Sequence, residues 1–268
     1  MLKLHAVLNK IGTKEHWMDY SKVKISRDDA FGNAERTSEF DLQRQLSKIG
    51  KPVDKSDWEM SQPTVNAYYD PQENDINFPA GILQPPFWDN KMDDAVNYGA
   101  IGAVIGHELT HAFDDQGRQY DAQGNLRDWW TPEDAKAFMA RADCVVKEYS
   151  GFSPAPDVYL KGDLTLGENA ADNGGIRLAY MALMDSLANH TAGKLDGFTP
   201  QQQFFLGFGQ IWCENTTEQA ARMQAATNPH SPGEFRANGV LRNMPEFQEA
   251  FSCKVGDAMV SADPCRVW

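Results

Sequence analysis

A chain of 268 residues, 41% apolar and 11% aromatic, can bury one sizeable hydrophobic core, so we expect a single domain over residues 1–268. Its formal net charge of −13, from 25 basic and 38 acidic residues, argues against nucleic acid or anionic lipid as a partner, because both would be repelled at long range. No apolar run is long enough to span a bilayer, and Lys3, His5 and Lys10 interrupt the N-terminal leucines, so neither a membrane contact nor a signal peptide is expected.

The first predicted element is one or two helices between residues 28 and 49. Apolar residues lie there among many charges, and Gly50 and Pro52 follow, which is typical of surface helices that pack through their apolar residues. In the next stretch, residues 64–78, apolar residues alternate with others on both sides of two turn-forming pairs, Asp70-Pro71 and Asn74-Asp75. This pattern predicts an antiparallel hairpin.

Helical periodicity dominates the remainder of the chain. After a proline-rich turn at residues 84–88, apolar residues recur at three- and four-residue steps from Ile101 to Ala112, which predicts a buried helix. Residues 228–243 are expected to form an ordered loop. Further helices are predicted at three stretches: residues 132–149, 168–188 and 200–216. The fold class that follows is mainly α with a small antiparallel β-sheet (α+β).

Four cysteines are too few and too scattered for a disulfide scaffold, and none forms a C-x-x-C pair of the kind found in four-cysteine zinc sites. They are Cys144, Cys213, Cys253 and Cys265. The even number permits disulfides in an oxidising compartment, but buried free thiols would give the same pattern. Spacing alone leaves both alternatives open.

The most specific pattern is H-E-x-x-H, which places His107, Glu108 and His111 inside the predicted apolar helix. Four residues are little more than one helical turn, so both imidazoles project from one face and can hold one zinc ion at about 2.0–2.1 Å. Glu108 would then face the water on the metal. The alternative is two surface histidines at this spacing by chance, but the chain has only 6 histidines, so such a coincidence would be rare.

A hydrolytic zinc site needs a third protein ligand and an open position for water. Glu168 is the best candidate, because it opens a predicted helix on which Asp172 lies one turn further along the same face. One carboxylate can bind zinc while the other accepts the remaining N–H of a ligand histidine, and Asp114 can serve the second histidine. Glu168 could instead be only a favourable anion at a helix N-terminus, but Gly174-Gly175, which permit close helix contact, favour the metal ligand.

Three separated stretches, HELTHAFDD (107–115), ENAAD (168–172) and CRVW (265–268), resemble in order and spacing the neprilysin and endothelin-converting-enzyme family of zinc metalloendopeptidases. Further matches are VNAYY (65–69), FPAGILQPPF (78–87) and HSPGEFR (230–236). The similarity covers essentially the entire chain. It implies a zincin-like (thermolysin-like) catalytic core that holds one Zn²⁺ ion through His107, His111 and Glu168.

The resemblance also implies the roles of a peptide-hydrolysis site. Glu108 would be the general base and proton shuttle for a zinc-activated water, and Asp172 would assist catalysis by bracing a ligand. His230 would stabilise the oxyanion, and Arg236 would bind a substrate carbonyl. Taken by itself, a histidine such as His230 in a Pro/Gly-rich loop is more often an ordinary surface residue.

Peptide substrates are the partners that the resemblance implies. Asn66 and Ala67, on the predicted edge strand, would hydrogen-bond an extended peptide backbone. Five positions match an apolar pocket that receives the residue after the scissile bond: Ile82, Phe87, Val104, Ile211 and Trp212. Cleavage on the N-terminal side of hydrophobic residues would follow, although ordinary core packing is the alternative for each of the five.

A complete family member has a large helical N-terminal portion that caps the cleft, and this chain has no stretch that matches it. We therefore expect a truncated product or fragment, with a separate capping portion or second chain as a candidate partner. The resemblance implies a Cys144–Cys265 disulfide and leaves Cys213 and Cys253 free, since their partners would lie in the capping portion. It also implies an extracellular or periplasmic location.

Three functions compete at this point. The first is an endopeptidase that acts on oligopeptides. The second is a catalytically silent fragment that binds zinc or peptide, because half a cleft could leave the substrate unpositioned. The third is a structural zinc domain, which would require a fourth protein ligand that the sequence does not supply.

Overall fold

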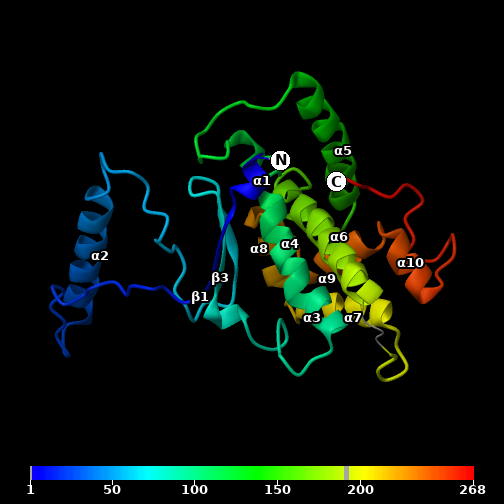
Figure 1. The fold of residues 1–268 in the computed structure, drawn as a ribbon, viewed down its shortest axis with the longest axis horizontal. Coiled ribbons are helices and arrows are strands. Elements are labelled where there is room, and N and C mark those ends of the chain that lie inside the picture. Colours follow the sequence, from blue (N-terminus) through cyan, green and yellow to red (C-terminus); the bar gives the residue numbers. More distant parts are fainter. Residues whose placement is uncertain (1, 190–192) are drawn as a thin grey trace.

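The computed structural model describes residues 2–189 and 193–268, which are mostly helical (Figure 1). The α-helices of these residues have the following bounds: α1 (Leu2–His5), α2 (Ala30–Leu46), α3 (Asp94–Asn97), α4 (Ala103–His111), α5 (Pro132–Ser150), α6 (Leu166–Asn189), α7 (Pro200–Ile211), α8 (Glu218–Thr227), α9 (Gly233–Leu241) and α10 (Pro245–Phe251). Three short helices of other kinds lie between them: η1 (Ala80–Ile82), η2 (Tyr98–Gly102) and η3 (Gly117–Gln119). A mainly α-helical fold with a small sheet confirms the predicted class.

The small sheet has the strand order β1-β3-β2. Its strands are β1 (Leu8–Gly12), β2 (Tyr68–Asp70) and β3 (Asp75–Pro79). β2 and β3 pair in antiparallel fashion, with Tyr69 opposite Ile76, which confirms the predicted hairpin. β1 pairs parallel to β3, so the sheet is mixed, and the prediction of a purely antiparallel sheet was wrong. β1 is short, partly polar and paired with a strand far along the chain, so no local pattern marks it.

Helix α2 projects away from the other helices, at the left of Figure 1. Its apolar residues were expected to serve packing, but Phe31 is 76% exposed and Ile49, just beyond the helix, is 74% exposed. The expectation was wrong for these two residues, whereas Phe40 packs on Tyr20 with ring centres 5.3 Å apart. The helix is tied to the following segment by polar contacts instead, because Arg44 and Lys48 both reach the carboxylate of Asp57, at 3.2 and 2.7 Å.

The helix that carries the H-E-x-x-H motif forms as predicted. α3, the π-helix η2 and α4 follow one another without a break. Ile105 of α4 is 42% exposed, however, so one face of this helix meets solvent and the prediction of a fully buried helix was wrong there. α7 also ends at Ile211, five residues before the predicted boundary.

Residues 228–243 were predicted to form a loop, yet most of them form α9. Two glycines in this stretch are typical of loops and so argued against a helix, but close packing explains both of them. A Cβ at Gly233 would lie 2.6 Å from the carbonyl oxygen of Trp212, and one at Gly239 would lie 2.7 Å from the hydroxyl of Tyr149. Close tertiary packing therefore requires glycine at these two positions, although glycine has a low helix propensity.

Hydrophobic clusters on both sides of α6 hold the helices together. One includes Ile176 of α6 with Phe204 and Phe208 of α7. Another includes Ala170 of α6 with Val145 of α5. A smaller cluster joins the sheet, η1 and η2. α6 is thus fixed along its length, which gives any side chain near its start a defined position.

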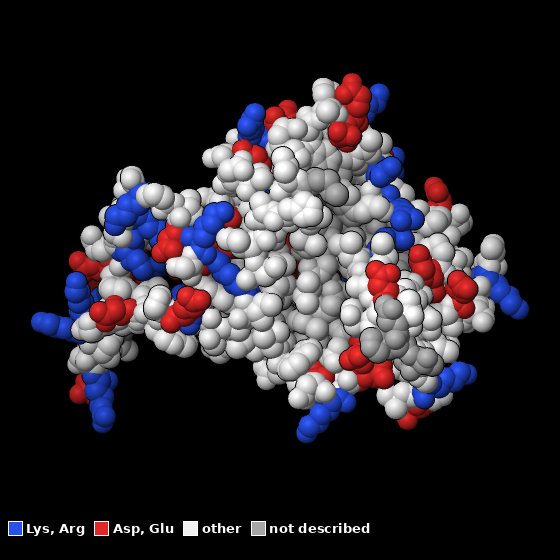
Figure 2. All heavy atoms as spheres, in the orientation of Figure 1, with Lys and Arg blue, Asp and Glu red and all other residues white. Residues whose placement is uncertain are grey.

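The charge of the chain is not gathered into one patch on the face that Figure 2 shows. Lys and Arg alternate there with Asp and Glu around the periphery, and the centre is largely uncharged. Among the described helices, none combines the length and apolar character needed to cross a bilayer.

Candidate metal centre and active site

The site is built where α4 and α6 lie side by side (Figure 1). A Cβ at Gly106 would lie 2.8 Å from the Cα of Gly175, and one at Gly175 would lie 2.7 Å from the Cα of His107, so only glycines fit this crossing. Gly175 follows Glu168 and Asp172 at helical spacing, so the three share one face of α6. That face is therefore pressed against the histidines of α4.

Each motif histidine has one ring nitrogen bound to a carboxylate. The Nδ1 of His107 lies 2.7 Å from Oδ1 of Asp172, and the Nδ1 of His111 lies 2.6 Å from Oδ2 of Asp114. These hydrogen bonds leave both Nε2 atoms as the available donors to a metal, and the two Nε2 atoms lie 2.9 Å apart. Asp172 and Asp114 thus lie where bracing carboxylates were predicted.

Glu168 lies against the same pair of Nε2 atoms. Its Oε2 is 3.3 Å from Nε2 of His107, and its Oε1 is 3.7 Å from Nε2 of His111. Ligands of a tetrahedral zinc ion at about 2.0–2.1 Å are separated by about 3.3 Å, so these three groups fit one ion. Oε2 of Glu168 is also buried without a hydrogen-bond partner, which is unusual for a carboxylate oxygen and fits an atom that binds a cation.

Glu108 is a second carboxylate beside the imidazoles. It is 5% exposed, and one of its oxygens lies within 4.8 Å of ring nitrogens of His107 and His111. Burial raises the pKa of Glu108, although the positive imidazoles oppose the shift. Proximity alone would permit either carboxylate to bind a metal. Glu168 differs from Glu108 in that its two oxygens lie 3.3 and 3.7 Å from the two Nε2 atoms, near the separation expected between ligands of one ion.

The surrounding carboxylates raise the pKa values of both motif imidazoles. Burial alone would lower the pKa of His107, but Asp172 and Glu168 outweigh burial and raise it to about 10. The pKa of His111 is also raised, because Asp114 and the neighbouring glutamates outweigh burial and the charge of His107. Burial would raise the pKa of Glu168, yet His107 reverses the effect and lowers it. A metal ion at this site must therefore displace protons.

Arg236, on α9, is held beside the histidines by a bidentate ion pair. Its Nε and Nη2 donate to the two oxygens of Asp172, each at 2.7 Å, and its guanidinium lies 4.0 Å from the ring centre of Trp212. Nη2 also lies 3.6 Å from Oε2 of Glu168. Asp172 therefore bridges a candidate zinc ligand and a candidate substrate-binding cation.

His230 lies at the open side of the site, with its side chain 46% exposed. Its Nε2 is 3.3 Å from Oε1 of Glu168, and its Nδ1 is 3.0 Å from Oδ1 of Asn228. Burial on its inner side lowers the pKa of His230. The structure thus brings His230 beside Glu168, and Asn228 contacts the other nitrogen of its ring.

A buried pair that no sequence pattern indicated connects the His230 loop to α6. The hydroxyl of Ser231 donates to Oδ1 of Asn169 at 2.9 Å, and both residues are at most 2% exposed. Asn169 follows Glu168 and Ser231 follows His230, so their positions next to two candidate residues were a signal that could have identified them.

One cavity of about 660 Å³ joins the candidate residues. Its lining includes His107, Glu108, His111, Glu168, Asp172, His230 and Arg236, and also Asn66, Ala67, Ile82, Phe87, Val104, Ile211 and Trp212. Ile82 is 3% exposed and packs in the cluster around the sheet, so core packing and pocket lining are compatible for these apolar residues. Asn66 and Ala67 precede β2, which is an edge strand of the sheet, instead of lying within it.

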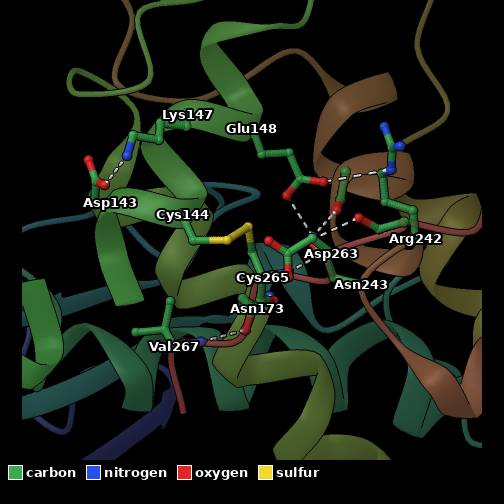
Figure 3. The surroundings of a disulfide bond; sticks show 12 residues. Asp143, Cys144, Lys147, Glu148, Asn173, Arg242, Asn243, Asp263, Cys265 and Val267 are labelled. Atoms are coloured by element: carbon green, nitrogen blue, oxygen red, sulfur yellow. Dashed lines mark hydrogen bonds and ion pairs between the residues drawn. A yellow bond between two sulfur atoms is a disulfide. The ribbon is translucent and has the colours of Figure 1, made fainter. Parts of the chain in front are cut away.

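A disulfide joins α5 to the C-terminal tail, which contacts α6 (Figure 3). Cys144 of α5 is bonded to Cys265 of the C-terminal tail, the pairing that the resemblance implies, and Cys213 and Cys253 are unpaired. The tail then runs along α6, where Nδ2 of Asn173 donates to the carbonyl oxygen of Cys265 at 3.2 Å. Asn173 adjoins Asp172, so the tail packs directly behind the site.

Known proteins match this chain over most of its length. Residues 66–267 match the profile of "Peptidase family M13". An endothelin-converting enzyme homolog from Locusta migratoria is 43% identical over 99% of this chain and 38% of its own length, and endothelin-converting enzyme 1 from Homo sapiens is 43% identical over 99% and 36%. The chain thus spans less than two fifths of these curated relatives.

Solved structures show the same fold. An inhibitor complex of the zinc metalloprotease ZMP1 from Mycobacterium tuberculosis superposes with a TM-score of 0.95 at 44% identity, over 100% of this chain and 42% of that one. PEPO from Lactobacillus rhamnosis gives 0.86 at 33% identity, over 98% and 40%.

Proposed function

This chain belongs to peptidase family M13, and on that premise we propose that it is a zinc-dependent endopeptidase of oligopeptides. The observation that supports this most directly is the meeting of His107, His111 and Glu168 beside a buried Glu108 in one open cavity. A structural zinc site would need a fourth protein ligand, and the cavity instead leaves room for water and substrate.

In this proposal His107, His111 and Glu168 hold one zinc ion. The chemistry that a bound zinc ion supplies is Lewis acidity, which makes water a nucleophile near neutral pH. Glu108 accepts the proton of the attacking water and later delivers it to the leaving amine. Burial suits Glu108 to both steps, because a raised pKa brings the carboxylate closer to the pH at which it must gain and lose a proton.

His230 and Arg236 then act on the substrate. His230 stabilises the charge that develops on the carbonyl oxygen, and Arg236, fixed by Asp172, donates to a substrate carbonyl. Asn66 and Ala67 hydrogen-bond the peptide backbone beside the free edge of β2. Because Ile82, Val104 and Trp212 make the adjoining wall apolar, we expect cleavage on the N-terminal side of hydrophobic residues.

A second candidate function is a silent zinc- or peptide-binding fragment. It is favoured by one observation, that the chain spans less than two fifths of the curated relatives' length. A separate capping chain would then be the partner that completes the cleft. We further propose an extracellular or periplasmic location, because the Cys144–Cys265 disulfide suits an oxidising compartment.

The decisive experiment is Glu108→Gln in the zinc-loaded protein, with metal content and hydrolysis of a peptide library measured together. Zinc content should stay the same, and kcat should fall by about 10²–10⁴-fold, because the amide cannot accept the proton. Glu133→Gln, the same change at an exposed position of α5, is the matched control and should leave both unchanged.

Each other outcome has a distinct meaning. Loss of zinc from Glu108→Gln would make Glu108 a ligand and overturn the assigned roles. Wild-type turnover in this variant would exclude Glu108 as the base. A wild-type chain that binds zinc but cleaves no peptide in the library would establish the silent fragment.

A further inference from the structure

Lys3, near the beginning of the chain, is a buried cation without a role in the proposed chemistry. It is 3% exposed. Its Nζ donates to three carbonyl oxygens, those of Ala112 at 2.7 Å, Gly117 at 2.6 Å and Tyr120 at 2.8 Å. An ammonium group has three N–H donors and no acceptor, so these contacts satisfy it completely.

The surroundings explain why a charge is tolerated at this depth. Nζ lies 5.6 Å from the ring centre of Tyr69, 5.7 Å from that of Phe113 and 6.0 Å from that of Trp129. Aromatic faces attract a desolvated cation, and the carboxylates of Asp114 and Asp121 attract it as well. Removing the ammonium would leave three carbonyl oxygens, two of them in buried contacts, without this donor.

Those carbonyls belong to the segment that follows the second zinc-binding histidine. Ala112 is the C-terminal cap of α4, where helix carbonyls lack partners within the helix and carry partial negative charge. Gly117 and Tyr120 lie in and after η3. Lys3 therefore closes the end of α4 and ties it to the next turn.

Asp114 holds the same turn from the inner side. Its Oδ1 accepts hydrogen bonds from the backbone nitrogens of Gln116 at 2.9 Å and Gly117 at 2.7 Å, while its Oδ2 contacts Nδ1 of His111 at 2.6 Å. Gly117 thus receives one constraint from Asp114 at its nitrogen and one from Lys3 at its carbonyl oxygen. The orientation of His111 depends on a turn that is fixed from both sides.

We propose that Lys3 is a positioning residue of the zinc centre, which sets the orientation of His111 by clamping the turn that carries Asp114. The proposal rests on the proposed function, in which His111 binds zinc. It also makes the N-terminal segment part of the catalytic unit, although Lys3 lies outside residues 66–267 that match the family profile.

The test is the rate at which zinc leaves the protein for a chromophoric chelator, measured with Lys3→Met. Methionine keeps most of the side-chain volume and removes the donors. Loss of an outer contact of a metal ligand typically weakens metal binding by 10–100-fold, so we expect zinc release to accelerate by about tenfold or more. kcat should fall while KM changes little, since no substrate-binding group is altered.

Lys10→Met is the matched control. Lys10 lies on the same N-terminal segment and forms partly buried ion pairs, at 2.6 Å with Glu73 and 2.7 Å with Asp75, but it contacts the sheet and not the end of α4. This variant should lower the unfolding midpoint without changing zinc release. Stability loss alone is thereby separated from loss of positioning.

Lys3→Gln is the second variant, because it retains two N–H donors and is milder if Lys3→Met does not fold. The rate of zinc release from Lys3→Gln should lie between the rates of the wild type and Lys3→Met. If Lys3→Met cannot be obtained, the rate from Lys3→Gln should still exceed the wild-type rate. Wild-type zinc release in a folded Lys3 variant would reduce Lys3 to a structural contact and overturn the proposal. Failure of the wild-type chain to bind zinc would instead overturn the proposed function.

Discussion

At the scale of single residues, two carboxylates of the site have pKa values that are shifted in opposite directions by their surroundings. Glu168 faces two imidazoles and a guanidinium, so its pKa is lowered, whereas the pKa of the more deeply buried Glu108 is raised. The first is therefore suited to bind a cation as a permanent anion. The second is suited to exchange a proton during the reaction.

The pH profile should reflect Glu108. A general base acts only when ionised, so kcat/KM should decline as the pH falls through the pKa of Glu108. The measurement is kcat/KM of the zinc-saturated protein against pH, with bound zinc determined at every point. The same acid limb in the residual activity of Glu108→Gln would contradict the assignment.

Acid should also release the metal. The raised pKa values of His107 and His111 mean that protons compete with zinc for both imidazoles, so zinc affinity should weaken steadily as the pH falls. Competition titrations against a chelator at several pH values would measure the trend, together with the protons released on binding. Zinc affinity that does not vary with pH would be the contrary result.

At the scale of elements, the crossing of α4 and α6 decides whether a site exists. Gly175→Ala would place a Cβ 2.7 Å from the Cα of His107, and backbone cannot yield as a flexible side chain can. We expect a loss of about 1–3 kcal/mol in the free energy of unfolding, together with weaker zinc binding. Urea unfolding and zinc titration would measure the two effects.

Gly209→Ala on α7 is the control for this substitution. A Cβ there meets nothing within 4 Å, so alanine should stabilise the helix by about 0.5–1 kcal/mol and leave zinc binding unchanged. Equal effects of the two substitutions would show that the glycines of α6 are not needed for close approach.

At the scale of the whole molecule, the Cys144–Cys265 disulfide joins α5 to the tail across a sequence separation of 121 residues. Replacing both cysteines by serine should lower the free energy of unfolding by about 2–5 kcal/mol, because the unfolded chain regains the freedom of a long loop. Urea unfolding under nonreducing conditions would measure it. Serine at the unpaired Cys213 and Cys253 should have little effect, and a comparable loss there would contradict the observed pairing.

Local sequence determined the elements whose pattern repeats over a few residues. The spacing of His107 and His111, the turn pairs of the β2–β3 hairpin and the shared face of Glu168 and Asp172 all follow from helical or strand periodicity. For candidate site residues within such patterns, the sequence alone predicted both the residue and the side chain that it contacts. The resemblance to a family added His230 and Arg236, whose surroundings carry no local signal of their own.

Tertiary structure alone decided the features that depend on partners distant in the chain. The parallel pairing of β1, the helix hidden by Gly233 and Gly239, and the exposure of Phe31 have no local signature. Neither does Lys3, whose ammonium is satisfied by carbonyls more than one hundred positions away. Backbone carbonyls are the same at every position, so only the folded chain shows which of them meet one buried cation.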